Sequence, residues 1–339
     1  MNIVFRVDSS SIMGSGHVMR CLVLADELYK QQHKIFFICR ELTGNLISQI
    51  KYSTLILPRD ETFKSDVLYI NWQGATQELD AKQSIKVIPE NTDLLIVDSY
   101  ALDCEWHKRL RRYTQKIMII DDLANREFDC DILVNQNAGA RKEDYTNKVP
   151  NNCELLLGCD FALLRPEFAK LRKISLKKRT NTREVQNIMI SMGGSDVNNI
   201  TYEVLRQLDD NFNFNVVVVL GGKSFHNKMI QNYAKGKNIK VVIDATNMSE
   251  LMFEADLAIG AGGSTSWERC CLGLPALLFI TAENQRVIAE NLERSGAIKI
   301  IENLQRDLQT MINDFALWQA MVESAQVICD GLGVKRIKI

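Results

Sequence analysis

Short apolar runs alternate with longer segments of helical periodicity along most of the chain. Ten such runs cover residues 3–7, 35–39, 94–97, 117–120, 132–134, 188–192, 216–220, 240–243, 257–259 and 276–280. Continuous apolar runs of this length are typical of buried strands, and helix-length segments between them favour parallel sheets. We therefore expect an α/β protein in which helices cover both faces of each sheet.

The runs fall into two similar halves, which indicates two domains. The length of 339 residues also exceeds what one hydrophobic core usually organises. The halves meet near residues 170–185, and the Lys- and Arg-rich segment 170–183 is interpreted as a solvated hinge rather than a binding patch. We predict two Rossmann-like domains, 1–172 and 173–339, with parallel sheets that face each other across a cleft.

Composition limits the binding partners and the cellular location that we expect for the protein. The net charge of −1 gives no general attraction to nucleic acid or to an anionic membrane, so neither is expected as a partner. No apolar run reaches about 18 residues, and the chain begins directly with a strand pattern rather than a signal peptide. Nine cysteines lack CxxC or zinc-like spacing, which favours reduced thiols. A cytoplasmic location is expected.

The first candidate for chemistry is His17, which follows glycines in the segment Gly14-Ser15-Gly16-His17. The segment joins the apolar run 3–7 to a helical pattern over 18–29, so His17 is expected at a helix N-terminus and a strand's carboxyl end. Ligands bind at that place in open α/β sheets, and an imidazole there can transfer protons near neutral pH. A helix-capping or solvated histidine is the alternative interpretation.

A second glycine turn follows the run 257–259 and leads into another helical pattern. Gly263, Ser264 and Thr265 offer backbone and hydroxyl donors suited to a pyrophosphate. Glu268, about one helical turn later, could then accept from the hydroxyls of a ribose. Neither glycine cluster matches the dinucleotide fingerprint or the P-loop, so NAD binding and ATP hydrolysis are not favoured.

Other polar residues have two readings. Asp121 and Asp122 could suggest a metal site, but without a third ligand pattern a cap and turn role is favoured. Asp8 could be a site residue or a turn residue, and Tyr100 could line a site or pack at a domain edge. The remaining histidines are expected to be exposed and without chemistry: His33, His107 and His226.

Several motifs follow one another along the chain in an order that resembles a known family. They are Arg6-Val7-Asp8-Ser9-Ser10, Gly14-Ser15-Gly16-His17, Val97-Asp98-Ser99-Tyr100, Ile120-Asp121-Asp122, residues 131–137, Ser191-Met192-Gly193-Gly194-Ser195-Asp196, residues 262–268 and Ala282-Glu283-Asn284-Gln285. Together they resemble the UDP-2,4-diacetamido-2,4,6-trideoxy-β-L-altropyranose hydrolases of pseudaminic acid biosynthesis, which serves flagellin glycosylation. The resemblance extends from Ile3 to about Gly296.

The resemblance implies a GT-B fold, similar to the enzyme that transfers N-acetylglucosamine in peptidoglycan synthesis, with UDP bound by the C-terminal domain. It places the general base on His17. The implied substrate-binding residues are Asp8, Gly16, Tyr100, Gly194, Ser195, Met248, Gly263, Ser264, Thr265, Glu268 and Asn284. Among these, Glu268 would hold the ribose, and the backbone around Met248 would hold the uracil. The sequence departs from the family at Ser99, where histidine is frequent, and at Cys159, where proline is frequent.

The implied reaction is hydrolysis of the bond between the anomeric carbon and the UDP oxygen. His17 would take a proton from the attacking water, and attack opposite the departing UDP would invert the anomeric carbon. The partners are then a UDP-linked amino sugar and water, with no cofactor or metal, and a monomer is expected. Two alternatives remain open: an inverting UDP-sugar glycosyltransferase on the same fold, and a catalytically silent UDP-sugar-binding protein.

Overall fold

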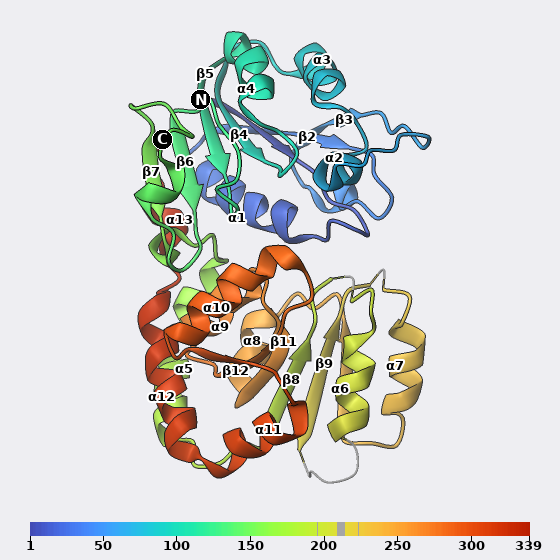
Figure 1. The fold of residues 1–339 in the computed structure, drawn as a ribbon, viewed down its shortest axis with the longest axis vertical. Coiled ribbons are helices and arrows are strands. Elements are labelled where there is room, and N and C mark those ends of the chain that lie inside the picture. Colours follow the sequence, from blue (N-terminus) through green and yellow to red (C-terminus); the bar gives the residue numbers. More distant parts are fainter. Residues whose placement is uncertain (195, 209–213, 223) are drawn as a thin grey trace. The chain divides into compact units, whose positions relative to one another are not determined.

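The computed structural model describes residues 1–194, 196–208, 214–222 and 224–339, except for the side chain of Asn284 (Figure 1). The chain forms two compact units. Unit 1 comprises Met1–Leu163 and Val334–Ile339, and unit 2 comprises Leu164–Gly333. Each unit contains one parallel sheet with helices, so the predicted α/β class is confirmed.

Unit 1 is built on a seven-stranded parallel sheet of order β3-β2-β1-β4-β5-β6-β7. Its strands are β1 (Asn2–Val7), β2 (Lys34–Arg40), β3 (Ser53–Leu57), β4 (Thr92–Asp98), β5 (Thr114–Ile120), β6 (Ile132–Asn135) and β7 (Glu154–Leu157). Its α-helices are α1 (Gly16–Lys30), α2 (Leu68–Gln73), α3 (Gln77–Val87), α4 (Cys104–Leu110) and most of α13 (Gly333–Arg336).

Two hydrophobic layers cover the faces of this sheet. Ile3 and Phe5 of β1 pack on one face with the apolar stripe of α1, which includes Leu24. Val4 points to the other face and packs with α3 and α4, where Trp106 is fully buried. The alternation of side chains along a strand therefore builds one layer on each face, as expected for a doubly wound sheet.

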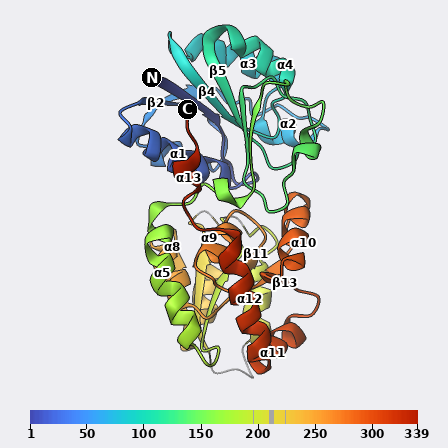
Figure 2. The same cartoon turned by 90° about the vertical axis from the view of Figure 1, so that its left-hand side faces the viewer.

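The C-terminal segment returns to unit 1, which the sequence did not predict. Val334 and Ile337 join the hydrophobic layer beside α1, where Figure 2 shows α13. Arg336 donates to the backbone carbonyl of Asp160 at 2.9 Å. The structure therefore divides the chain after Leu163 and returns its last six residues to the first unit, in place of the expected single boundary at 172/173.

Unit 2 has a six-stranded parallel sheet of order β10-β9-β8-β11-β12-β13. Its strands are β8 (Asn187–Ser191), β9 (Asn215–Leu220), β10 (Ile239–Ile243), β11 (Leu257–Ala261), β12 (Ala276–Phe279) and β13 (Ile298–Ile300). Its α-helices are α5 (Pro166–Asn181), α6 (Ile200–Leu208), α7 (Asn227–Ala234), α8 (Met248–Glu254), α9 (Thr265–Cys271), α10 (Arg286–Arg294), α11 (Leu304–Asn313) and α12 (Phe315–Ile328). Side chains from α6, α11 and α12 cover one face of this sheet.

Segment 170–183 is not a solvated hinge, because most of it belongs to helix α5. Arg179 is buried and donates to the backbone carbonyls of Leu272, Ala255 and Met252 at 2.8–3.0 Å. Arg172 donates to the carbonyl of Cys271 at 2.7 Å. These carbonyls lie at or just after the C-termini of α8 and α9, where helices leave acceptors unpaired and favour positive charge. The basic residues that suggested a hinge therefore fasten α5 to its neighbours.

The apolar runs correctly located ten strands but missed β3, β7 and β13. All three are edge strands of their sheets. They are three to five residues long, and their side chains are largely half-buried or exposed. β3 and β7 each carry only a short apolar run, Leu55–Leu57 and Leu155–Leu157, and Lys299 interrupts the apolar residues of β13.

Candidate active site

The strand order of unit 1 reverses between β1 and β4, which are adjacent and parallel. His17 is the second residue of α1, the helix that follows β1, and Asp98 is the last residue of β4. Both residues therefore lie at the carboxyl edge of the sheet, at its topological switch point. Ligands bind outside this edge in open α/β sheets. The predicted position of His17 is confirmed.

His17 is held by a buried carboxylate. Its Nδ1 lies 2.5 Å from Oδ1 of Asp98, whose side chain is fully buried, whereas the His17 side chain is 10% exposed. Burial by itself would raise the pKa of Asp98, but Arg20 and His17 outweigh it and hold this pKa well below the usual range. A charged carboxylate only accepts hydrogen bonds, so Nδ1 must donate. In the neutral ring, Nε2 is then left with a free lone pair.

Arg20 joins this pair to a second carboxylate. Its Nε and one terminal nitrogen donate to Asp98 at 2.6 and 2.7 Å, and its other terminal nitrogen donates to both oxygens of Asp122 at 2.9 and 2.7 Å. Tyr100 donates its hydroxyl to Asp122 at 2.7 Å, and its ring meets that of His17 edge-on with centroids 4.6 Å apart. We call these five residues, His17, Arg20, Asp98, Tyr100 and Asp122, the His17 network.

Burial and charge fix the protonation states within the network. Burial would lower the pKa of Arg20, but Asp122 and Asp98 raise it well above the ordinary value. Burial, together with the charge of Asp122, raises the pKa of Tyr100 well above that of a free phenol. Arg20 therefore stays a cation, and Tyr100 keeps its proton and remains a donor.

Sequence reasoning singled out His17 and Tyr100 but gave no role to Asp98 or Arg20. Two signals could have identified them. Asp98 ends a predicted strand, and Arg20 lies three residues after His17, on the same face of a helix. Neither signal shows that β1 and β4 are neighbours, which is what brings Asp98 to His17.

Asp8 lies in a different group of charges. Its Oδ1 accepts from the backbone nitrogen of Arg40 at 2.6 Å and pairs with the Arg6 guanidinium at 2.7 Å, and the residue is 2% exposed. Both arginines also pair with the buried carboxylate of Asp80. Within the described part of the chain, no hydrogen bond joins Asp8 to the His17 network. These contacts hold Asp8 at the carboxyl ends of β1 and β2, and its role in substrate binding stays a prediction.

The turn interpretation of Asp121 is confirmed. Its Oδ2 accepts from the backbone nitrogens of Leu123 and Ala124 at 3.2 and 2.7 Å, and its Oδ1 pairs with Arg126 at 2.9 Å. Asp122, in contrast, belongs to the His17 network. Among the described residues, no group of three or more His, Cys, Asp or Glu side chains is arranged to hold a metal ion.

The expectation for the other histidines is wrong at His107. This residue is fully buried in α4, and its ring stacks on Phe128 with centroids 6.0 Å apart. Burial, together with the charges of Arg126 and Arg111, lowers its pKa to about 3. His33 and His226 are half-buried. The polar neighbours of His107 in the sequence suggested exposure, but His107 lies on the face of α4 that packs against the core.

The residues predicted to bind the nucleotide lie at the corresponding edge of unit 2. The order of this sheet reverses between β8 and β11. Gly193-Gly194 follows β8, with Gly193 in the left-handed region at φ +88°, and Gly263 and Ser264 follow β11. The second glycine turn leads directly into α9, which begins at Thr265. The structure therefore brings both turns to the switch point of unit 2.

Glu268 lies in α9 with a cation beside it. Its Oε1 is 3.2 Å from a guanidinium nitrogen of Arg165, which also pairs with Glu167 at 3.4 Å. Burial raises the pKa of Glu268, and Arg165 and Arg269 oppose that rise. Arg165 thus favours the ionised carboxylate, the form that can accept from two hydroxyls.

The remaining predicted residues are placed as follows. Met248 is the first residue of α8 and is buried, and Gly16 is the first residue of α1. Asn284 lies in the short 3₁₀ turn Glu283–Gln285, and its side chain is outside the described part. Ser195 also lies outside the described residues.

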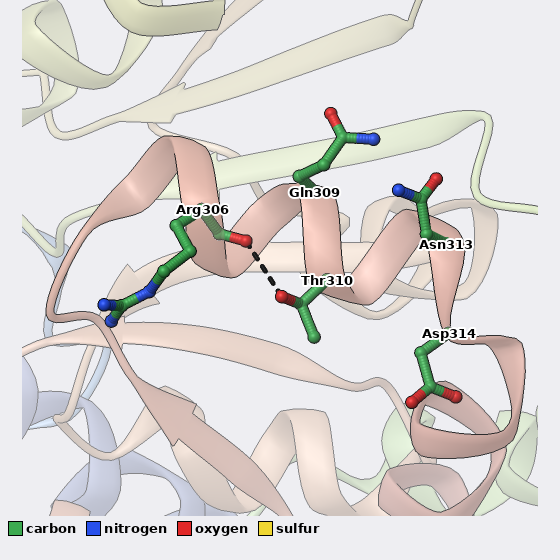
Figure 3. Close-up of a pocket in the computed structure, with 5 residues that line it drawn as sticks. All are labelled: Arg306, Gln309, Thr310, Asn313 and Asp314. Atoms are coloured by element: carbon green, nitrogen blue, oxygen red, sulfur yellow. Dashed lines mark hydrogen bonds between the residues drawn. The ribbon is translucent and has the colours of Figure 1, made fainter.

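One hollow of the described structure involves none of the predicted site residues. Figure 3 shows a hollow along α11 and the residue after it, lined by Arg306, Gln309, Thr310, Asn313 and Asp314. None of these is a predicted site residue, and Thr310 simply donates to the backbone carbonyl of Arg306 at 3.0 Å. No described helix is both long enough and apolar enough to cross a membrane.

Comparison with known proteins identifies the family. UDP-2,4-diacetamido-2,4,6-trideoxy-β-L-altropyranose hydrolase of Campylobacter jejuni is 31% identical over 300 residues, which cover 87% of this chain and 97% of that protein. The chain belongs to this hydrolase family. The predicted family is thereby confirmed, and with it the prediction of an enzyme of the nucleotide-sugar hydrolase class. Residues 187–319 of this family member also match the glycosyltransferase family 28 C-terminal domain.

Solved structures establish the fold of this hydrolase-family chain. MurG of Acinetobacter baumannii matches with a TM-score of 0.64 at 14% identity, covering 99% of this chain and 97% of that one. A co-structure of S. aureus MnaA with UDP matches with a TM-score of 0.66 at 12% identity, covering 99% and 95%. With both parallel sheets, these likenesses confirm the predicted GT-B type of fold.

Proposed function

We propose that the protein hydrolyses a UDP-linked diacetamido-trideoxy hexose, releasing UDP and the free sugar, and that His17 is the general base. The observation that carries the proposal is the contact between His17 Nδ1 and the buried carboxylate of Asp98. This contact leaves Nε2 as the proton acceptor at the carboxyl edge of the sheet. It is the arrangement that general-base catalysis needs, in which a third group orients the base.

Besides the base, hydrolysis requires little from the side chains of unit 1. A glycosyl diphosphate already has a good leaving group, so the enzyme must place a water molecule and remove its proton. A positioned base contributes about 10² to 10⁴ in rate. If His17 deprotonates a water on the face opposite UDP, the anomeric carbon is inverted. Tyr100, which keeps its proton, supplies a phenolic edge beside the His17 ring.

Unit 2 would hold the nucleotide. Glu268 would accept from the ribose, and the glycine turns after β8 and β11 would donate to the diphosphate. The name of the Campylobacter jejuni relative supports UDP-2,4-diacetamido-2,4,6-trideoxy-β-L-altropyranose as the substrate. The family resemblance carried by the sequence motifs further implies a place in pseudaminic acid biosynthesis.

The test is UDP release from this substrate in the absence of any acceptor. We expect the wild type to release UDP and free sugar in equal amounts. His17→Gln keeps a polar side chain but cannot act as a base, so turnover should fall by about 10² or more while UDP still binds. Turnover within about threefold of the wild type would remove His17 from the role of base.

A glycosyltransferase is the second candidate, favoured by the match of residues 187–319 to a glycosyltransferase domain. Water and an alcohol acceptor would require the same base. The two functions differ in the acceptor alone, so a transferase would release UDP slowly until a sugar or lipid alcohol is added. Rapid release without an acceptor decides for hydrolysis.

A further inference from the structure

Arg20 is the one cation in the His17 network, and it contacts both of its carboxylates. One edge of its guanidinium binds both oxygens of Asp98, at 2.6 and 2.7 Å, and a terminal nitrogen binds both oxygens of Asp122. The nitrogen that donates to Asp98 Oδ1 also lies 3.3 Å from Nδ1 of His17. Fixed forks of this kind are specific to arginine, since lysine carries a single point charge.

We propose that Arg20 is a positioning residue that favours the neutral form of His17 and holds Asp98 as the acceptor of its Nδ1 proton, so that Nε2 is ready to accept a proton. The proposal rests on the proposed role of His17 as base and assigns the control of that base to a neighbouring side chain. It adds a residue to the reaction that acts through His17 rather than on the substrate.

The charges of the network carry the argument. Asp98 and Asp122 contribute two negative charges and Arg20 one positive charge, so the groups around the ring sum to −1. They come from α1, from the end of β4 and from the segment after β5, and Tyr100 adds a neutral phenol. Without Arg20 the sum becomes −2, and the nearest group to His17 is an uncompensated carboxylate. That field favours the protonated ring, which cannot act as a base.

The same charge count favours the reaction. When Nε2 takes the proton of water, the imidazolium brings the sum of the network to zero. Arg20 therefore leaves no net positive charge in the network once the imidazolium has formed. Its second contact holds Asp122, which in turn accepts from Tyr100 and fixes the ring that meets His17 edge-on.

The test observes the His17 ring directly by ¹⁵N NMR of protein labelled at histidine. The chain has four histidines, so few signals need resolving, and His17→Gln assigns the one that disappears. We expect the wild-type ring to carry its proton on Nδ1 near neutral pH. In Arg20→Met the pH midpoint of the ring titration should rise by about 1 unit or more, since removal of a charge within about 4–6 Å shifts titration by 1–3 units.

Two further variants test whether the shift in Arg20→Met results only from a change in structure. Arg20→Lys keeps the positive charge but loses the fork, so its midpoint should stay closer to the wild type than that of Arg20→Met. Arg126→Met removes another arginine of unit 1, which pairs with Asp121 rather than with the His17 network, and should leave the midpoint within about 0.3 units. Hydrogen–deuterium exchange of unit 1 identifies any variant that fails to fold.

The NMR result does not depend on turnover, so this proposal and the proposed function fail separately. A wild-type ring protonated on Nε2, or an Arg20→Met midpoint equal to that of the wild type, would overturn the role of Arg20. Absence of UDP release from any UDP-sugar, with the NMR shifts as expected, would overturn the proposed function alone. If both hold, the low-pH limb of the activity profile moves upward in Arg20→Met together with the ring titration.

Discussion

Glu268→Gln gives the sharpest test of the nucleotide side, because it removes the charge while keeping the shape of the side chain. An ionised carboxylate can accept from both ribose hydroxyls, whereas an amide offers one oxygen and turns its NH₂ toward the second hydroxyl or Arg165. Arg165, 3.2 Å from Glu268, also loses its charged partner. The expected consequence is weaker binding of UDP rather than slower chemistry.

The magnitude follows from the contact that is lost. A hydrogen bond to a charged group contributes about 1.5–3 kcal/mol, and 1.4 kcal/mol is a factor of ten in affinity. Loss of one such bond should therefore weaken UDP binding roughly 10- to 150-fold. Because burial raises the pKa of Glu268, the wild type should also lose UDP affinity on acidification at a higher pH than an ordinary glutamate would give.

The assay is titration calorimetry with UDP and with 2′-deoxy-UDP, arranged as a double cycle. If Glu268 holds the ribose, 2′-deoxy-UDP binds the wild type more weakly than UDP, and the difference between the two ligands is smaller in Glu268→Gln. Glu167→Gln is the matched control, since Glu167 also pairs with Arg165 but is not expected to contact the ribose. Its UDP affinity should stay within about twofold. If removal of the 2′-hydroxyl from UDP weakens binding equally in the wild type and in Glu268→Gln, a contact between Glu268 and the ribose is refuted.

Three other predictions follow from single contacts. Tyr100→Phe keeps the ring beside His17 but removes the donor to Asp122, so kcat/KM should fall about tenfold in a UDP-release assay. Burial lowers the pKa of His107 from 6.5 to about 3, so its neutral ring contributes to the free energy of unfolding above pH 6.5, and this contribution is lost as the pH falls toward 3. In urea unfolding, the free energy of unfolding of His107→Phe should therefore gain about 2 kcal/mol relative to the wild type between pH 7 and pH 5. A difference between the two proteins that does not change with pH would contradict this. Gly260→Ala would place a Cβ 2.6 Å from a backbone carbonyl of the neighbouring strand, so it should cost unit 2 about 1–3 kcal/mol in the same measurement, and an unchanged midpoint would argue against this packing.

The sequence predicted those parts of the fold that depend on local patterns. His17 was placed correctly because a strand, a glycine turn and a helix follow one another within about 30 residues. Asp98 was missed as its partner because the two residues are 81 positions apart and meet only when β4 pairs with β1. No periodicity in the sequence records that pairing.

Charged segments misled the prediction for a related reason. In α5, Arg179 reads as a solvated side chain, yet it is buried because unpaired carbonyls at the ends of two other helices need donors. His107 has charged neighbours in the sequence, but α4 turns the ring onto Phe128. In both cases tertiary neighbours decide what the local composition cannot.

The central claim is that water, activated by His17, attacks the anomeric carbon of a UDP-linked sugar. The most direct measurement is a single turnover of UDP-2,4-diacetamido-2,4,6-trideoxy-β-L-altropyranose in H₂¹⁸O, with mass spectrometry of both products and ¹H NMR of the anomer first formed. We expect ¹⁸O in the anomeric hydroxyl of the sugar, none in UDP, and inverted configuration in the first product. Recovery of the label in UDP, or retention at the anomeric carbon, would contradict the account.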